Sequence, residues 1–282
     1  MKGNKSNITV TKASGHNEPF SIKKLKNSLL AAKATTDEIN SIVETLLPKL
    51  YQGISTQKIY KEAFRLLRHH SKHHAARYHL KRGMMELGPS GFPFEKFIGE
   101  LFKHQGYTVE VGKILQGKCV THEIDVIALK EKQINLIECK YRNQSGLAVD
   151  VKTPLYIHAR FEDVLANGFI SNKGKAFTGW VATNTKFTDD AIAYGNCKGM
   201  RLLGWDYPVN NSLKDLVDRS GLYPLTCLTS LTSHEKQWLL ANGFVLVKDI
   251  YTNQQLLLKA GVKEIRIKAV MDEGAKLCIL NE

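Results

Sequence analysis

Two neighbouring apolar segments in the middle of the chain carry charged residues where a folded core leaves little room for them. The segment EIDVIALKEKQINLIECKYRN, residues 123–143, predicts two β-strands joined by a short polar turn. Both faces of the first strand are largely apolar, which is typical of a strand covered on two sides. Asp125, Glu138 and Lys140 lie in these strands. A carboxylate there is costly unless a cation or a metal ion compensates its charge.

The two-residue period of a strand predicts which side chains share a face. In the first strand, Ile124, Val126 and Ala128 are expected opposite the face that holds Glu123, Asp125, Ile127 and Leu129. In the second strand, one face is expected to hold Ile134, Leu136, Glu138 and Lys140. Asp125 and Glu138 would then surround one divalent cation, with Lys140 beside it to orient a water or stabilise a phosphate. Ordinary ion pairs at strand ends are the alternative.

The helix that precedes the strands supplies a third acidic residue. FPFEKFIGELFKHQGYTVEV predicts a helix that stops at Gly106 and continues into a strand. At about 100° per residue, Glu95 lies on the flank of the apolar stripe and Glu100 lies well off it. Glu95 is therefore expected to lean toward the sheet.

The segments that follow alternate between helix and strand. A helix is expected near 152–168, a strand at 178–184, a helix at 189–199 and a strand at 200–205. A helix, three strands and then this alternation predict an α/β sandwich.

Several of these segments together resemble a known family. FEKFIGELFKHQGYTVEV, EIDVIALKEKQINLIECKYRN, WVATNTKFTDDAIAYG and LLGWD resemble the Mrr-like branch of the PD-(D/E)XK restriction-endonuclease superfamily, over roughly residues 92–206. The resemblance implies hydrolysis of DNA phosphodiesters with Mg²⁺ or Mn²⁺. It implies metal binding by Asp125, Glu138 and the Cys139 carbonyl, activation of water by Lys140, and a helix carboxylate at Glu95. Glu123 lies where that branch often has a Gly-containing turn, and would replace or crowd a metal ligand.

The N-terminal third of the chain carries most of the positive charge. Residues 1–90 contain 16 Lys and Arg against 6 Asp and Glu, which is +10 of the +13 formal charge of the whole chain. Such a surface suits the phosphates of a nucleotide or of nucleic acid. A basic helical surface without a ligand is the alternative.

A short hairpin followed by four helices is expected in this third. The hairpin covers residues 8–20, and apolar spacing predicts helices that begin at Ser21 and then cover 36–51, 56–69 and 73–86. VTKASGHNEPFSIKKL, followed by helices that end in HHAARYHLKR, resembles the ATP-cone, a nucleotide-sensing regulatory domain of ribonucleotide reductases. The resemblance covers about residues 8–88 and implies contacts with ATP or dATP at Lys12, Glu18, Lys24, Thr56, Val10 and Lys81.

The C-terminal segment changes character again. LTSHEKQWLLANGFVLVKDIYTNQQLLLKAGV predicts short helices separated at Asn242-Gly243 and at Ala260-Gly261. These units weakly resemble helix-hairpin-helix elements, which implies contacts with a phosphate backbone through turn N–H groups and Lys248, Lys263, Arg266 and Lys268. A small helical unit that only packs against the rest of the chain is the alternative.

The remaining features concern the protein's location. Five scattered cysteines without a CxxC pair argue against a disulfide framework and a zinc ribbon. No apolar run reaches the roughly 18 residues that span a bilayer, and the N-terminus lacks the apolar region of a secretory signal. We expect a cytoplasmic protein without a membrane partner.

Together these patterns predict a multidomain chain of the α+β and α/β classes. The expected parts are an ATP-cone at 1–88, a restriction-endonuclease-like α/β sandwich at 92–215 and a helical tail at 221–282 whose resemblance to helix-hairpin-helix elements implies DNA binding. The expected function is that of a nucleotide-regulated, metal-dependent DNA endonuclease, which forms homo-oligomers and acts in defence against foreign DNA. A nucleotide-sensing DNA-binding regulator that does not cut is the main alternative, and processing of branched DNA or RNA is a third.

Overall fold

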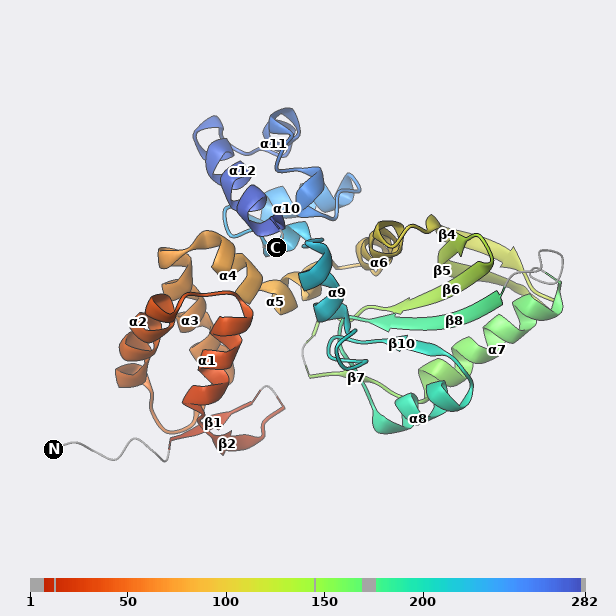
Figure 1. Ribbon diagram of the computed structural model, residues 1–282, viewed down its shortest axis with the longest axis horizontal. Coiled ribbons are helices and arrows are strands. Elements are labelled where there is room, and N and C mark those ends of the chain that lie inside the picture. Colours follow the sequence, from red (N-terminus) through yellow and green to blue (C-terminus); the bar gives the residue numbers. More distant parts are fainter. Residues whose placement is uncertain (1–7, 13, 145, 169–175, 280–282) are drawn as a thin grey trace.

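Three parts of the chain lie side by side in space. The computed structural model describes residues 8–12, 14–144, 146–168 and 176–279. Figure 1 shows N-terminal helices on a small sheet, a larger sheet flanked by helices, and a cluster of C-terminal helices that meets both. Within the described ranges, no helix is long and apolar enough to cross a membrane.

The N-terminal part combines a three-stranded sheet with five α-helices. Its strands have the order β2-β1-β3, with β1 and β3 parallel. Its elements are β1 (Thr9–Thr11), β2 (Asn17–Pro19), α1 (Ile22–Ala31), α2 (Thr36–Leu46), η2 (Leu47–Lys49), β3 (Ile54–Ser55), α3 (Thr56–His70), α4 (Lys72–Tyr78) and α5 (Leu80–Met85). Leu29, Ile42 and Leu67 form its fully buried centre.

Two predicted helices of this part are interrupted. The segment expected as one helix over 36–51 ends as α2 at Leu46 and continues as the 3₁₀ helix η2, because Pro48 has no N–H for a helical hydrogen bond. The segment expected over 73–86 is two helices that meet at His79. The strand β3 was not predicted, because two residues are too few to show a period of two.

The central part is a helix–sheet–helix sandwich. The sheet has the order β10-β8-β6-β5-β4, in which β4, β5 and β6 are antiparallel and β6, β8 and β10 are parallel. The elements are α6 (Phe92–His104), β4 (Thr108–Gln116), β5 (Thr121–Lys130), β6 (Gln133–Lys140), β7 (Ala148–Val149), α7 (Lys152–Ala166), β8 (Ala176–Thr183), β9 (Lys186–Phe187), α8 (Asp189–Cys197), β10 (Arg201–Leu203) and α9 (Leu213–Ser220). The predicted succession of helices and strands is confirmed.

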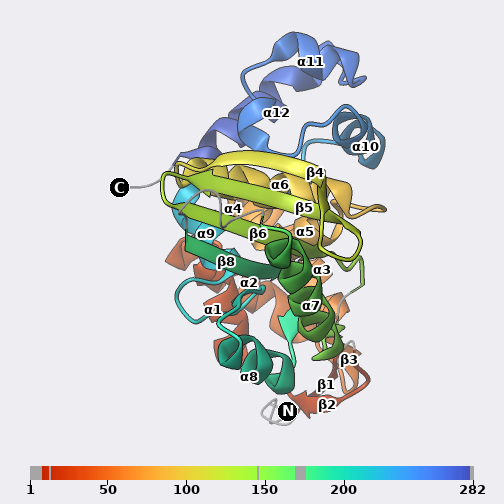
Figure 2. The same cartoon turned by 90° about the vertical axis from the view of Figure 1, so that its right-hand side faces the viewer.

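Each face of the large sheet has its own apolar cluster. Phe94, Phe97 and Ile98 of α6 pack with one face, while Ile157 and Phe161 of α7 pack with the other. Figure 2 shows α7 in front of the sheet and α6 beside its β4 edge. Both faces are therefore covered, as the apolar strands require.

The strict alternation expected along β5 is wrong at one position. Ile124 packs in the same cluster as Ile127, whereas Val126 lies in the cluster on the α6 side. The β4–β5 pairing skips Gly112 opposite Asp125, and Gly112 has φ of 65°. A residue with left-handed backbone conformation changes the local direction of the strand pair. At this point, side chains of β5 therefore change from one face of the sheet to the other.

The C-terminal part contains two similar units and a long helix. Each unit is a 3₁₀ helix followed by an α-helix and a glycine with positive φ, Gly243 in the first and Gly261 in the second. The elements are η4 (Leu225–Cys227), α10 (Ser233–Ala241), η5 (Val247–Asp249), α11 (Gln254–Lys259) and α12 (Glu264–Cys278). The predicted short helices are confirmed.

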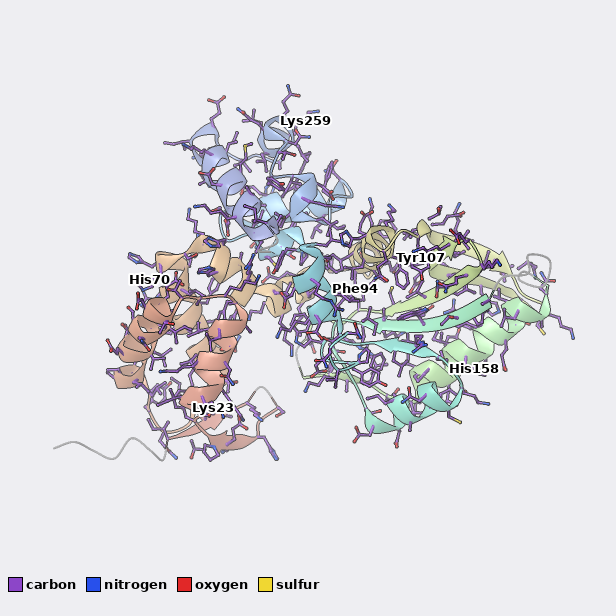
Figure 3. The ribbon with its side chains drawn as sticks, in the orientation of Figure 1. Lys23, His70, Phe94, Tyr107, His158 and Lys259 are labelled. Carbon is purple, nitrogen blue, oxygen red and sulfur yellow. The ribbon has the colours of Figure 1, made fainter. Side chains whose placement is uncertain are left out.

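One apolar core joins all three parts. It extends from Leu80 and Met84 of α5, through α6 and one face of the sheet, to Val270 and Leu277 of α12. Phe94, labelled in Figure 3, is fully buried in this core. The three parts therefore share a hydrophobic core and pack as one body, rather than as independent domains joined by linkers.

Candidate active site

Asp125 lies where the two charged strands separate. The β5–β6 ladder ends with the pair Val126 and Ile137. Beyond that pair, Oδ2 of Asp125 accepts a hydrogen bond from the Cys139 N–H at 2.7 Å. The carboxylate thus replaces a rung of the ladder. Since the N–H and C=O of a strand residue point to the same neighbour, the Cys139 carbonyl is directed to the same side.

Glu138 is held by a cation from the helix α7. It is only 8% exposed, and its Oε2 accepts a hydrogen bond from Nη1 of Arg160 at 2.7 Å. Nη2 of Arg160 also donates to the Glu123 carbonyl, which ties α7 to β5. The Glu123 side chain is exposed, and its charge adds to the effect of burial in raising the pKa of Asp125.

Glu95 approaches the same charges from the other helix. It lies in the first turn of α6 and is half-buried. Burial, and then the nearby charge of Asp125, raise the pKa of Glu95 to about 7. The charges of Asp125 and Glu138 both act on Glu95, so its side chain lies on the side of α6 that meets these strands, as expected from its place on the helix.

The carboxyl groups repel one another in a partly desolvated place. Burial, followed by the charge of Asp125, raises the pKa of Glu138 to about 7. Burial also raises the pKa of Asp125, although the Cys139 N–H opposes that rise. Lys140 lowers the pKa of both carboxyls. The structure thus brings together the four residues that the sequence analysis selected.

The donor set fits a hard divalent cation. Oδ1 of Asp125 and Oε1 of Glu138 make no hydrogen bond within the described ranges, and oxygen donors are those that Mg²⁺ prefers. Across the described chain, no three His, Cys, Asp or Glu side chains are placed to hold a metal together. An ion here would therefore take its further ligands from the Cys139 carbonyl and from water, as Mg²⁺ commonly does.

Supporting residues were missed by the sequence analysis. The Asn184 side chain is fully buried and makes two hydrogen bonds to the backbone of Arg142, at 2.9 and 2.7 Å. Thr183 donates to the Lys140 carbonyl at 2.7 Å. Both fix the chain just beyond β6, and so fix Lys140. A buried polar run directly after an apolar strand, TNT at 183–185, was the available signal, whereas Arg160 gave none.

Five of the six residues assigned to a nucleotide lie on or beside the small N-terminal sheet. Glu18 forms ion pairs with Lys12 at 2.7 Å and with Lys24 at 3.2 Å. Val10 pairs with Glu18 across β1 and β2. Thr56 begins α3, directly after the strand that pairs with β1.

The sixth residue lies elsewhere. The ammonium of Lys81 on α5 stands 5.6 Å from the centre of the Trp205 ring. This cation–π contact places it against the central part of the chain, near Asp206 and Lys186, whose charges act on it.

The four cations assigned to DNA binding in the C-terminal units differ in whether an acidic residue already neutralises them. Arg266 is bound to Glu235 at 2.6 Å and also donates to the Ser230 carbonyl, so it stabilises the local fold. Lys248 lies 3.9 Å from Glu100 of α6. Lys263 and Lys268 are exposed.

Comparisons with known proteins agree with this geometry. A family model described as a restriction endonuclease matches residues 88–206, and one described as AF1548-like, C-terminal, matches residues 223–278. An uncharacterized protein of Archaeoglobus fulgidus is 32% identical over 181 residues, which are 64% of this chain and 99% of that protein. The crystal structure of a protein of unknown function, AF1548, is similar with a TM-score of 0.55 and 29% identity, over 67% of this chain and 98% of that one.

Proposed function

This chain belongs to the family of that Archaeoglobus fulgidus protein and contains a restriction endonuclease domain at residues 88–206; from this premise we propose that it is a divalent-metal-dependent DNA endonuclease. One observation carries the proposal. Glu95, Asp125 and Glu138 converge at the end of a buried sheet. Burial raises the pKa of each, and the charge of Asp125 raises the pKa of Glu95 and of Glu138 further. Carboxyl groups with a shifted pKa and a lysine beside them are typical of a catalytic site.

The proposed ligands are Asp125, Glu138 and the Cys139 carbonyl. A bound Mg²⁺ or Mn²⁺ supplies Lewis acidity to the scissile phosphate and lowers the pKa of a bound water. The Cys139 N–H fixes the Asp125 carboxylate, and Arg160 fixes the Glu138 carboxylate, so both are oriented before an ion arrives. Ligands that are already oriented lose less conformational entropy when a metal ion binds.

The remaining residues act on the substrate and on protons. Lys140, on the same face of β6 as Glu138, orients the attacking water and stabilises negative charge on the phosphate. Glu95, with its pKa raised to about 7, holds or releases a proton near neutral pH. Arg160 holds the Glu138 carboxylate and compensates its charge in the metal-free protein.

The N-terminal part is proposed to bind ATP or dATP as a regulatory ligand. Lys12 and Lys24 converge on one carboxylate, that of Glu18, where the phosphates of a nucleotide would find two cations. We further propose that nucleotide binding changes homo-oligomerisation and so brings two nuclease sites to the two DNA strands. Defence against foreign DNA is one use of such an enzyme.

A regulator that binds DNA without cutting it is the second candidate. It is favoured by the ion pair between Arg160 and Glu138, which satisfies one proposed ligand without a metal. In such a protein the same residues would serve only for stability.

Cleavage assays distinguish the two. Unmethylated, methylated and branched DNA would be incubated with Mg²⁺ or Mn²⁺, with and without ATP and dATP. The variants are Asp125→Asn, whose amide oxygen still accepts from the Cys139 N–H, and Lys140→Ala. Asp150→Asn, an exposed carboxylate of the same domain, is the control. The endonuclease requires cleavage that Asp125→Asn and Lys140→Ala abolish and Asp150→Asn retains. DNA binding without cleavage, identical in all variants, supports the regulator.

A further inference from the structure

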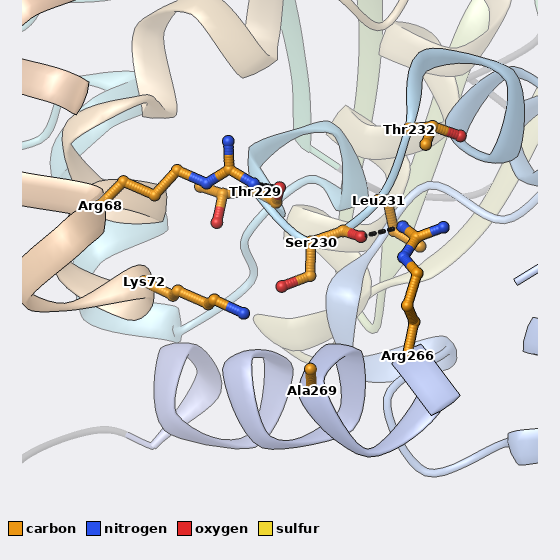
Figure 4. A pocket seen from close by; sticks show the side chains of 8 residues that line it. All are labelled: Arg68, Lys72, Thr229, Ser230, Leu231, Thr232, Arg266 and Ala269. Carbon is orange, nitrogen blue, oxygen red and sulfur yellow. Dashed lines mark hydrogen bonds between the residues drawn. The ribbon is translucent and has the colours of Figure 1, made fainter. Parts of the chain in front are cut away.

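A pocket separate from the candidate active site lies between the N-terminal and C-terminal parts. Its volume is about 410 Å³, within the range of small-ligand sites. Figure 4 shows it bounded by the junction of α3 and α4, by the loop before α10 and by α12. None of the residues that line it belongs to the restriction endonuclease domain.

The lining of this pocket is cationic and rich in hydroxyl groups. Its polar residues are Arg68, Lys72, Arg266, Thr229, Ser230 and Thr232, and it has no Asp or Glu among its lining residues. Guanidinium, ammonium and hydroxyl groups all donate hydrogen bonds to an anion. The chemistry of the wall therefore selects a negatively charged ligand with several acceptor oxygens.

Two acidic residues beside the pocket, Glu235 and Glu273, are already engaged. Glu235 is bound to Arg266 at 2.6 Å. Glu273, which is 3% exposed, accepts from the Thr229 N–H, the Thr229 hydroxyl and the Ser230 N–H at 2.7 to 2.8 Å. Glu273 thus holds the loop and engages the Thr229 hydroxyl, while the Ser230 hydroxyl is left without a partner among the described residues.

Two cations of the pocket have no acidic partner. Within the described residues, neither Arg68 nor Lys72 forms a salt bridge; Arg68 donates one hydrogen bond, to the Thr229 carbonyl at 2.9 Å, which points its guanidinium at the loop. The buried Ser230 hydroxyl has no hydrogen-bond partner in the same residues. In Figure 4, the Lys72 and Ser230 side chains extend toward the same space.

We propose that this pocket binds a phosphate group through Arg68, Lys72 and the Ser230 hydroxyl. A phosphate neutralises the two unpaired cations and satisfies the buried hydroxyl. It also joins the α3–α4 junction to the loop before α10, and so ties the N-terminal part to the C-terminal part. The phosphate can be that of a free nucleotide or that of a DNA strand, since both present the same oxygens.

Titration of the full-length protein with inorganic phosphate, followed by calorimetry, tests the site. Lys72→Gln is the deciding variant, because the Lys72 side chain makes no hydrogen bond or salt bridge with the part of the chain that the structure describes, whereas Arg68→Gln also loses a contact with Thr229. Each is expected to weaken phosphate binding about tenfold, as the loss of one charge-assisted hydrogen bond does. Ser230→Ala is expected to weaken it several-fold.

The matched controls are on α3, the helix that carries Arg68. Lys61→Gln and Arg65→Gln remove one positive charge each from α3 without touching the pocket. They are expected to leave phosphate affinity unchanged. If Lys61→Gln weakened binding as much as Lys72→Gln, or if wild type failed to bind phosphate, the proposal would be overturned.

Two further titrations identify the source of the phosphate. ATP and a short DNA duplex would each be titrated in a Lys24→Ala background, which removes the nucleotide site proposed on the N-terminal sheet. Weaker ATP binding in Lys72→Gln assigns the pocket to a nucleotide, and weaker duplex binding assigns it to DNA. An effect on inorganic phosphate alone indicates an adventitious ion and overturns the proposal. Because none of these titrations requires cleavage, the proposed nuclease activity can fail independently.

Discussion

Arg160 on α7 donates a hydrogen bond to Glu138 on β6 at 2.7 Å, so a residue proposed as a metal ligand has a cation of the chain as its partner. This contact opposes the effects of burial and of Asp125, which together raise the pKa of Glu138 to about 7. The ion pair therefore lowers the pH at which Glu138 ionises, which is the form that its proposed role as a metal ligand requires.

Arg160→Gln is expected to move the pH–rate profile of DNA cleavage to higher pH. Without the guanidinium, the pKa of Glu138 rises further, and the ionised ligand is formed only at higher pH. We expect a shift of the rising limb by about one pH unit. Rates would be measured from pH 5.5 to 9 with Mg²⁺. Arg201→Gln, an exposed arginine of β10, is the control, and an unchanged limb in Arg160→Gln would contradict the prediction.

Glu95→Gln is expected to stabilise the metal-free protein above neutral pH. The pKa of Glu95 is about 7 in the folded protein and 4.5 when unperturbed, so the folded state binds more protons between these values. The free energy of unfolding then falls as pH rises from 4.5 to 7, and Gln removes this loss. After allowance for solvent around the half-buried side chain, the gain at pH 8 is about 1 kcal/mol.

Urea unfolding in a chelator at pH 4.5 and pH 8 checks this. The difference between Glu95→Gln and wild type should be present at pH 8 and vanish at pH 4.5. Glu100→Gln, on the same helix and paired with Lys103, is the control for the loss of an acidic side chain from α6. A difference of equal size at both values would rule out the proposed cause.

Lys24→Ala is expected to weaken ATP binding by about tenfold or more, because it removes one of the two cations that converge on Glu18. Lys12→Ala should act in the same direction. Lys23→Ala removes an exposed charge from the adjacent position of α1, labelled in Figure 3, and should have no effect. Calorimetric titration with ATP measures all three, and equal affinities would remove the nucleotide proposal.

Glu273→Ala is expected to destabilise the protein by about 2 to 4 kcal/mol. The buried carboxylate accepts three hydrogen bonds from Thr229 and Ser230, and alanine leaves these donors without a partner. The neighbouring Asp272 is exposed, so Asp272→Ala should change stability by less than about 0.5 kcal/mol. Urea unfolding compares the two, and similar values for both would show that the loop does not depend on Glu273.

The sequence was most informative where a residue contradicted its local environment. Asp125 and Glu138 stood out because each lies within an apolar strand, and Glu95 because of its place on the flank of an apolar stripe. Arg160 could not be found in this way, since an arginine on an amphipathic helix is ordinary and its partner is 22 residues away. Its role depends on how α7 crosses the sheet, which no local pattern contains.

Local departures from regular backbone geometry could not be predicted from the sequence either. The exchange of faces at Ile124 depends on the conformation of Gly112 on the neighbouring strand. The two-residue strands β3, β7 and β9 exist only because longer-range packing brings their partners together. The division of the chain at residues 88, 92, 215 and 221 stays a prediction, and the shared core shows why composition alone is a weak guide to it.

That shared core has a consequence for how the protein is made. Met84, Phe94 and Leu277 are fully buried in one apolar cluster, although almost 200 residues separate the first from the last. During synthesis the ribosome releases α5 and α6 long before α12, so α6 can pack on the sheet while the place of α12 in the cluster is still empty. The cluster is complete only after residue 277 has left the ribosome, so this core matures after the segments that form the central sheet have emerged.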